Sequence, residues 1–143
     1  MKKPEQEEEK KYLHSDDTGT VLKAFYAVYN QLGHGFSERI YKEALALELR
    51  ELAIKYEQEK PIKIYYLGVE IGEEISDLVV NSRIVVEIEC KPEAGFDDEN
   101  RLLNLLKSSD YEVGLLLNFG KVPHQRRKIF TNNLKTRNSE KIE

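Results

Sequence analysis

The spacing of hydrophobic residues first follows a helical period. Apolar side chains recur every three or four positions over residues 21–32 and again over residues 37–53. Gly33 and Gly35 interrupt this pattern, and Ser37 is a residue type that commonly caps the start of a helix. The sequence therefore predicts two consecutive helices separated by a short break.

From Pro61 onwards the hydrophobic period falls to two, which is typical of strands. We expect strands over residues 61–66, 74–80, 83–91, 113–117 and 127–131, with a helix over residues 98–109. The predicted order is α-α-β-β-β-α-β, and the last expected strand comes after it. The helix over residues 98–109 connects two strands of this order. A crossover of this kind predicts a mixed sheet and a domain of the α/β or α+β class.

The length of 143 residues fits one domain of ordinary size. We assign this domain to residues 16–131, with a charged, disordered tail over residues 1–15 and a polar tail over residues 132–143. The apolar runs are shorter than the ~18–20 residues that a membrane helix needs, and the single cysteine excludes an internal disulfide. We therefore expect a cytoplasmic protein that does not bind a membrane.

Acidic residues interrupt two of the predicted strands. With a period of two, Glu87, Glu89 and Lys91 share one face of their strand, and the other face is apolar. Asp77 lies in the preceding strand and is also flanked by apolar residues. Buried carboxylates are unfavourable unless they are paired or bound to a metal, so converging acids would raise one another's pKa or bind a divalent cation. The alternative is a strand whose acidic face is exposed to water.

The turn between these two strands decides whether the acids converge. If Asn81 and Ser82 form a two-residue loop, Asp77 lies opposite Val86 and points away from Glu87. A three-residue loop, or one bulge, instead places Asp77 opposite Glu87 and brings the acids onto one face. Residue propensities do not distinguish these registers, so both stay open.

Several segments, taken in chain order, resemble one known family. They are Gly35-Phe-Ser-Glu38-Arg-Ile-Tyr41, Tyr66-Leu-Gly68, Asp77-Leu-Val-Val, Ile84-Val-Val-Glu87, Leu102-Leu-Asn-Leu-Leu-Lys107 and Gly114-Leu-Leu-Leu-Asn-Phe-Gly120. Over residues 18–131 the chain resembles the GxxExxY protein family of the PD-(D/E)XK nuclease-like superfamily. The resemblance implies a restriction-endonuclease-like αβββαβ core, in which helices flank a central mixed sheet.

The resemblance also implies a catalytic site. It places Mg²⁺ or Mn²⁺ on Asp77 and Glu87 beside a phosphodiester, with Glu38 nearby as a further catalytic acid. The superfamily usually has a lysine where this chain has Glu89. Glu89 could act as a catalytic base or as a third metal ligand, but it supplies no positive charge.

Basic side chains could contact a nucleic-acid backbone. The chain has a net charge of −4, but its basic residues are concentrated in residues 121–143. The candidates for phosphate contact are Lys91, Arg101, Arg126, Arg127 and Lys128. The first two could replace the missing lysine, whereas the last three lie in an edge segment, where basic residues also commonly prevent strand pairing. Tyr41 follows Glu38 by one helical turn and could contact substrate, position that acid or pack in the core.

Together these features predict a bacterial or archaeal nuclease-like protein that uses Mg²⁺ or Mn²⁺ to hydrolyse phosphodiesters in nucleic acid, in the first place DNA. Two other classes stay open. One is a catalytically inactive module that keeps the fold and binds nucleic acid or a protein partner. The other is a structural protein whose acidic face is simply hydrated. A homodimer also stays open.

Overall fold

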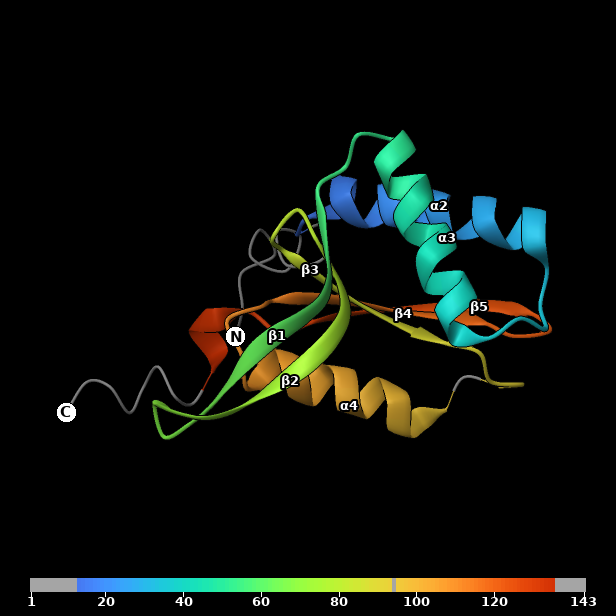
Figure 1. Ribbon diagram of the computed structural model, residues 1–143. Coiled ribbons are helices and arrows are strands. Elements are labelled where there is room, and N and C mark those ends of the chain that lie inside the picture. Colours follow the sequence, from blue (N-terminus) through green and yellow to red (C-terminus); the bar gives the residue numbers. More distant parts are fainter. Residues whose placement is uncertain (1–12, 94, 136–143) are drawn as a thin grey trace, which may run out of the picture.

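The computed structural model describes residues 13–93 and 95–135, which form three α-helices, five strands and one short 3₁₀ helix (Figure 1). In chain order these are α2 (Ser15–Leu32), α3 (Glu38–Glu51), β1 (Tyr56–Tyr66), β2 (Val69–Val80), β3 (Ile84–Glu89), α4 (Phe96–Lys107), β4 (Val113–Phe119), β5 (Pro123–Ile129) and η1 (Asn132–Leu134). The predicted order of helices and strands is confirmed, and the fold is mixed α/β.

The five strands form one sheet in the order β1-β2-β3-β4-β5. β3 and β4 are parallel and are connected through α4, whereas every other neighbouring pair in the sheet is antiparallel. The sheet is therefore mixed, as the position of the connecting helix predicted. β3 and β4 lie inside the sheet and are largely buried, which explains the nearly continuous apolar sequence of β4.

Helices cover both faces of the sheet: α2 and α3 lie on one face and α4 on the other (Figure 1). Val21, Phe25 and Val28 recur at helical spacing along α2 and belong to the larger hydrophobic core. Leu102 and Leu106 of α4 belong to a smaller core on the opposite face. This arrangement leaves side chains of β2 and β3 on the α4 side partly uncovered, where the predicted acidic residues lie.

Some strands begin earlier than the sequence predicted. β1 begins at Tyr56 rather than at Pro61, and β2 begins at Val69, so the two strands form a long hairpin. The predicted turn at Gly68 is confirmed, and its φ of +77° explains why glycine is favoured there. β5 begins at Pro123, because the first position of an edge strand tolerates a residue without a backbone N–H.

The start of the described chain differs from the prediction of a tail over residues 1–15. Residues 1–12 of that predicted tail lie outside the described residues, but Ser15 already begins α2. No helix in the described part of the chain is long and apolar enough to span a membrane.

Lys135, in the predicted polar tail over residues 132–143, packs against the domain. Its side chain is buried, and its ammonium group donates hydrogen bonds to the carbonyl oxygens of Ser109 and Tyr111, at 2.7 Å each. The rest of that predicted tail, residues 136–143, lies outside the described residues.

Candidate active site

The turn between β2 and β3 brings Asp77 and Glu87 together. Val80 pairs with Ile84, so three residues form the loop, and the register that runs from this pair places Asp77 opposite Glu87. Asn81 has a φ of +51° and the following serine has a φ of +57°, a backbone conformation that accommodates the longer loop. Of the two registers left open by the sequence, the one that joins the acids is therefore observed.

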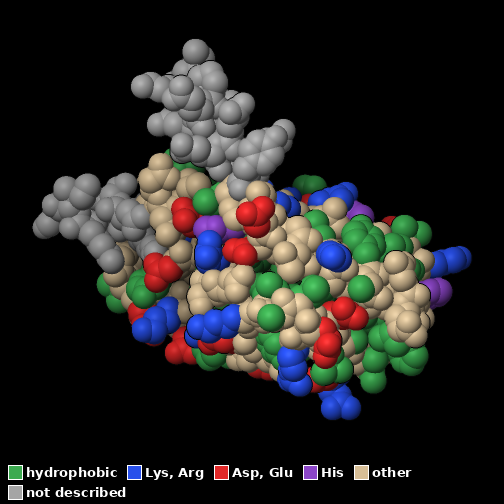
Figure 2. Space-filling model, turned by 90° about the horizontal axis from the view of Figure 1, so that it is seen from above, with side chains coloured by type: hydrophobic (Ala, Val, Ile, Leu, Met, Phe, Trp, Pro, Cys, Tyr) green, Lys and Arg blue, Asp and Glu red, His purple; other side chains and the backbone are tan. Residues whose placement is uncertain are grey.

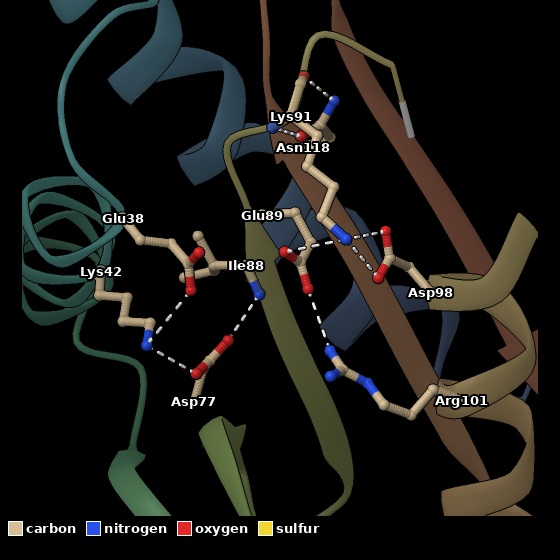
Figure 3. A network of polar contacts seen from close by, with 9 residues as sticks. All are labelled: Glu38, Lys42, Asp77, Ile88, Glu89, Lys91, Asp98, Arg101 and Asn118. Carbon is tan, nitrogen blue, oxygen red and sulfur yellow. Dashed lines mark hydrogen bonds and ion pairs between the residues drawn. The ribbon is translucent and has the colours of Figure 1, made fainter. Parts of the chain in front are cut away.

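Asp77 lies where the pairing of β2 with β3 ends, and both of its carboxylate oxygens have partners (Figure 3). Its Oδ2 accepts a hydrogen bond from the backbone N–H of Ile88 at 2.7 Å. Its Oδ1 lies 2.8 Å from the ammonium nitrogen of Lys42, which also lies 3.6 Å from a carboxylate oxygen of Glu38. The carboxylate thus accepts a backbone hydrogen bond from β3 at the end of the β2–β3 pairing and forms an ion pair with Lys42 of α3.

Lys42 was not among the site residues predicted from the sequence. Burial alone would lower the pKa of its ammonium group, but the hydrogen bond to Asp77 and nearby carboxylates raise that pKa overall. The side chain is 20% exposed and is cationic at neutral pH. Its spacing of four residues from Glu38 was the available signal, because residues at this spacing share one face of a helix.

Glu87 is held in its protonated form by its surroundings. Burial raises its pKa, and the adjacent charge of Asp77 raises it further, to about 8. When two carboxylates lie side by side, ionising both has a large free-energy cost unless a cation lies between them. In the absence of a divalent ion, the site at neutral pH therefore contains a cationic Lys42 and a neutral Glu87.

Glu89 points toward α4 and away from Asp77 (Figure 3). Its carboxylate lies 3.0 Å from the guanidinium of Arg101 and 3.9 Å from the ammonium of Lys91, which in turn contacts both oxygens of Asp98 at 2.8 Å. Burial and the nearby Asp98 raise the pKa of Glu89. Arg101 is 68% exposed, and exposed ion pairs contribute only about 0–1 kcal/mol, so this contact orients the guanidinium more than it stabilises the fold.

A pocket of about 480 Å³ lies between the β1–β2 hairpin and α4 and contains half of the predicted site residues. Its polar lining includes Glu38, Glu74, Asp77, Glu87, Glu89, Arg101, Asn104 and Ser108. All four acids that the sequence analysis proposed as catalytic residues face this pocket, together with one of the two proposed replacement cations.

The donor set of this pocket suits Mg²⁺ or Mn²⁺. Asp77 and Glu87 offer hard carboxylate oxygens, and a cation between them would relieve the repulsion that raises the pKa of Glu87. Mg²⁺ is commonly held by only one or two carboxylates, with water and substrate phosphate completing its shell. No group of three or more His, Cys, Asp or Glu side chains with the geometry of a metal site occurs among the residues described, and Glu89 is directed to Arg101 instead. The residues present therefore fit a two-carboxylate site.

The three basic residues of β5 do not line this pocket. Arg126 and Lys128 lie 3.8 and 2.9 Å from Glu99 of α4, whereas Arg127 donates a hydrogen bond to the backbone carbonyl of Leu13. Successive strand residues point to opposite faces, so the three side chains do not form one basic patch. Seen from the side of α2 and α3, acidic and basic side chains are interspersed (Figure 2).

Tyr41 and Asn118 form hydrogen bonds with the backbone of the domain and do not line this pocket. Tyr41 is fully buried, and its hydroxyl donates to the carbonyl of Gly33 at 2.6 Å and accepts the N–H of Phe36, so we assign it to anchoring this loop rather than to substrate contact. Asn118, which the sequence analysis missed as a functional residue, binds both the backbone N–H and the carbonyl of Lys91 at 2.9 Å. Its place in an apolar strand was the available signal, because buried amides need partners.

Three comparisons relate the chain to known proteins. A model that describes the PD-(D/E)XK nuclease superfamily matches residues 15–130, from the start of α2 to the end of β5. No curated protein sequence matches the chain. Among solved structures, the crystal structure of SSO0001 is similar, with a TM-score of 0.49 and 17% sequence identity. The similarity covers 65% of this chain and 50% of that one, so the chain matches half the length of SSO0001.

Proposed function

The chain belongs to the PD-(D/E)XK nuclease superfamily, and from this premise we propose that it is a phosphodiester hydrolase that uses Mg²⁺ or Mn²⁺ to cleave nucleic acid, in the first place DNA. The observation that carries the proposal is that Asp77 and Glu87 line one pocket and lie close enough for the charge of Asp77 to raise the pKa of Glu87. Within the superfamily we propose membership of the GxxExxY family, which the spacing of Gly35, Glu38 and Tyr41 supports.

Asp77 and Glu87 would hold the divalent ion. A bound ion supplies Lewis acidity, which lowers the pKa of a coordinated water and stabilises charge on the phosphoryl group. Asp77 is oriented for this role because the backbone N–H of Ile88 fixes one of its oxygens. Glu87 must lose its proton when the ion binds, so ion binding should strengthen as the pH rises toward about 8.

Glu89 and Arg101 would replace the functions of the usual lysine. Arg101 lines the pocket and is oriented by Glu89, so its guanidinium can bind a phosphate oxygen. The raised pKa of Glu89 makes its carboxylate a better proton acceptor near neutral pH than an ordinary glutamate. Lys42 balances the charge of Asp77 when no divalent ion is bound.

Cleavage assays test this proposal. We expect the protein to nick plasmid DNA or cut single-stranded DNA with Mn²⁺ or Mg²⁺, to be inactive in EDTA and to lose activity in Asp77→Asn and Glu87→Gln. Glu73→Gln, which alters an exposed acid of β2 outside the pocket, is the matched control and should retain activity. Equal cleavage by Asp77→Asn and wild type would overturn the proposal.

A catalytically inactive binding module is the second candidate, because Glu89 stands where the superfamily usually has lysine. Such a protein would bind nucleic acid or a protein partner and never cut. Binding of DNA in EDTA, together with no cleavage under any metal condition, would favour this candidate. If the protein binds neither metal nor nucleic acid, that result would favour a structural role.

A further inference from the structure

A second pocket of about 270 Å³ lies at the end of the sheet where β3 and β4 finish. Three segments line it: residues 34–36 of the loop between α2 and α3, residues 90–92 after β3, and residues 119–121 at the turn into β5. In Figure 1 these segments meet at the right-hand end of the molecule. Two of the segments that resemble the GxxExxY family, Gly35 to Tyr41 and Gly114 to Gly120, thus contribute to the same pocket.

Two buried hydrogen-bonding side chains hold the first two walls in place. The Tyr41 hydroxyl accepts the backbone N–H of Phe36 and donates to the carbonyl that precedes this wall. Asn118 holds the backbone of Lys91 through two hydrogen bonds of 2.9 Å. Gly120 is required for this contact, because a Cβ at its position would lie 2.4 Å from the carbonyl oxygen of Lys91.

The third wall is held by Tyr29 of α2. Its hydroxyl lies 3.0 Å from the carbonyl oxygen of Gly120 and 2.7 Å from that of Lys121, to which it donates. All three walls are therefore fixed by side chains from helices and strands, and the pocket is formed before any ligand binds. Because these walls are already ordered, the protein loses little conformational entropy when a ligand binds.

The lining of this pocket differs in charge from that of the acidic pocket. It contains Lys91, Lys121 and His34, and no carboxylate among the described residues that line it. The ring of Phe36 is 49% exposed. In Figure 2 hydrophobic side chains gather at this end of the molecule, with basic and histidine side chains at its margin.

The two pockets are neighbours. Phe36 precedes Glu38 of the acidic pocket by two positions, and Cys90 directly follows Glu89 of the acidic pocket. A chain that presents a phosphate to the acidic pocket can therefore continue over the end of β3 into the second pocket. The ammonium group of Lys91 is paired with Asp98, so Lys121 supplies the basic side chain of this pocket. An exposed aromatic ring and a lysine in one pocket offer a stacking surface and charge that is complementary to a phosphodiester backbone.

We propose that this second pocket binds an unpaired nucleotide next to the phosphate that is cleaved, with its base stacked on Phe36 and its phosphate near Lys121. The identity of the ligand rests on the proposed function. The volume lies just below the range of about 300–1,000 Å³ typical of drug-sized ligands, so it suits one base rather than a base pair. The preferred substrate is then single-stranded or locally opened nucleic acid.

Binding of a fluorescently labelled twelve-nucleotide DNA in EDTA, measured by anisotropy, tests this proposal without cleavage. Stacking on one aromatic side chain contributes about 1–3 kcal/mol, so Phe36→Ala should weaken binding of the single strand by about 5- to 150-fold. Phe36→Tyr should bind within about twofold of wild type. Tyr66→Ala, which removes an aromatic ring that is 63% exposed at the hairpin tip, is the matched control and should also bind like wild type. Lys121→Ala should reduce the salt dependence of binding.

The proposal would be overturned if Phe36→Ala bound the single strand as tightly as wild type, or if the matched duplex bound as tightly as the single strand. Thermal melting of each variant shows whether it folds. If Phe36→Ala does not fold, Phe36→Tyr, which keeps the aromatic ring, and the comparison with the duplex carry the test. The outcome is independent of catalysis. If the protein binds through Phe36 but never cuts, the proposed hydrolase activity is wrong and the proposed nucleotide site stands. If it cuts and Phe36→Ala has no effect on binding, only the proposed nucleotide site is wrong.

Discussion

Replacing Glu87 by glutamine should change how the stability of the metal-free protein depends on pH. In the folded chain, burial and the charge of Asp77 raise the pKa of Glu87 from 4.5 to about 8. In the unfolded chain the same carboxyl group ionises near 4.5. The folded protein therefore holds a proton that the unfolded chain releases between these two pH values. Stability that depends on this proton is fully present below pH 4.5 and is lost as the pH rises through about 8.

The size of the effect follows from proton linkage. Between pH 5 and pH 8 the difference in proton binding integrates to a loss of about 3–4 kcal/mol in the free energy of unfolding of the wild type. Single domains are stable by about 5–15 kcal/mol in total, so this loss is large. Glu87→Gln carries no titrating group at this position and should not show this loss.

Urea unfolding in EDTA at a series of pH values between 5 and 8.5 measures the effect. We expect the free energy of unfolding of Glu87→Gln to exceed that of wild type by an amount that grows by about 3–4 kcal/mol across this range. Glu73→Gln, at an exposed position, controls for the loss of one carboxylate and should follow the wild-type curve. A difference between Glu87→Gln and wild type that stays constant with pH would refute the inference that Glu87 is protonated beside Asp77.

Three further substitutions test the surroundings of the site. Lys42→Met removes the cation from Asp77 and should lower the free energy of unfolding by about 1–3 kcal/mol in EDTA, with part of that loss recovered on addition of Mn²⁺, as measured by urea unfolding. Tyr41→Phe removes both hydrogen bonds of a fully buried hydroxyl and should cost about 1–3 kcal/mol; a melting temperature equal to that of wild type would contradict this assignment. Gly120→Ala places a methyl group against the carbonyl oxygen of Lys91 and should cost about 1–3 kcal/mol, which unchanged thermal melting would disprove.

The faces of β3 could be predicted from the sequence, because strand residues alternate strictly between the two sides of a sheet. Glu87 and Glu89 share the α4 side, and Ile84, Val86 and Ile88 belong to the core under α2 and α3. The register against β2 could not be predicted, because it depends on loop length. The sequence at Asn81 and Ser82 permits both loops that we considered.

Contacts between distant parts of the chain were not predictable from local pattern. Lys42 meets Asp77 only because α3 packs beside the end of β2, and Asn118 meets Lys91 only because parallel strands β3 and β4 end together. The separation of Arg127 from its two neighbours follows from strand alternation, but only once that segment is known to be a strand over Pro123–Ile129. Local pattern therefore indicated which acids matter, and tertiary packing determined their partners.

The position of the divalent ion tests the account most directly. Crystals soaked in Mn²⁺ should show a peak of anomalous scattering between the carboxylates of Asp77 and Glu87, with Lys42 displaced from the oxygen that it contacts in the metal-free chain. A peak elsewhere in the pocket, or no peak at a concentration that supports cleavage, would contradict the assignment of these two side chains as the metal ligands.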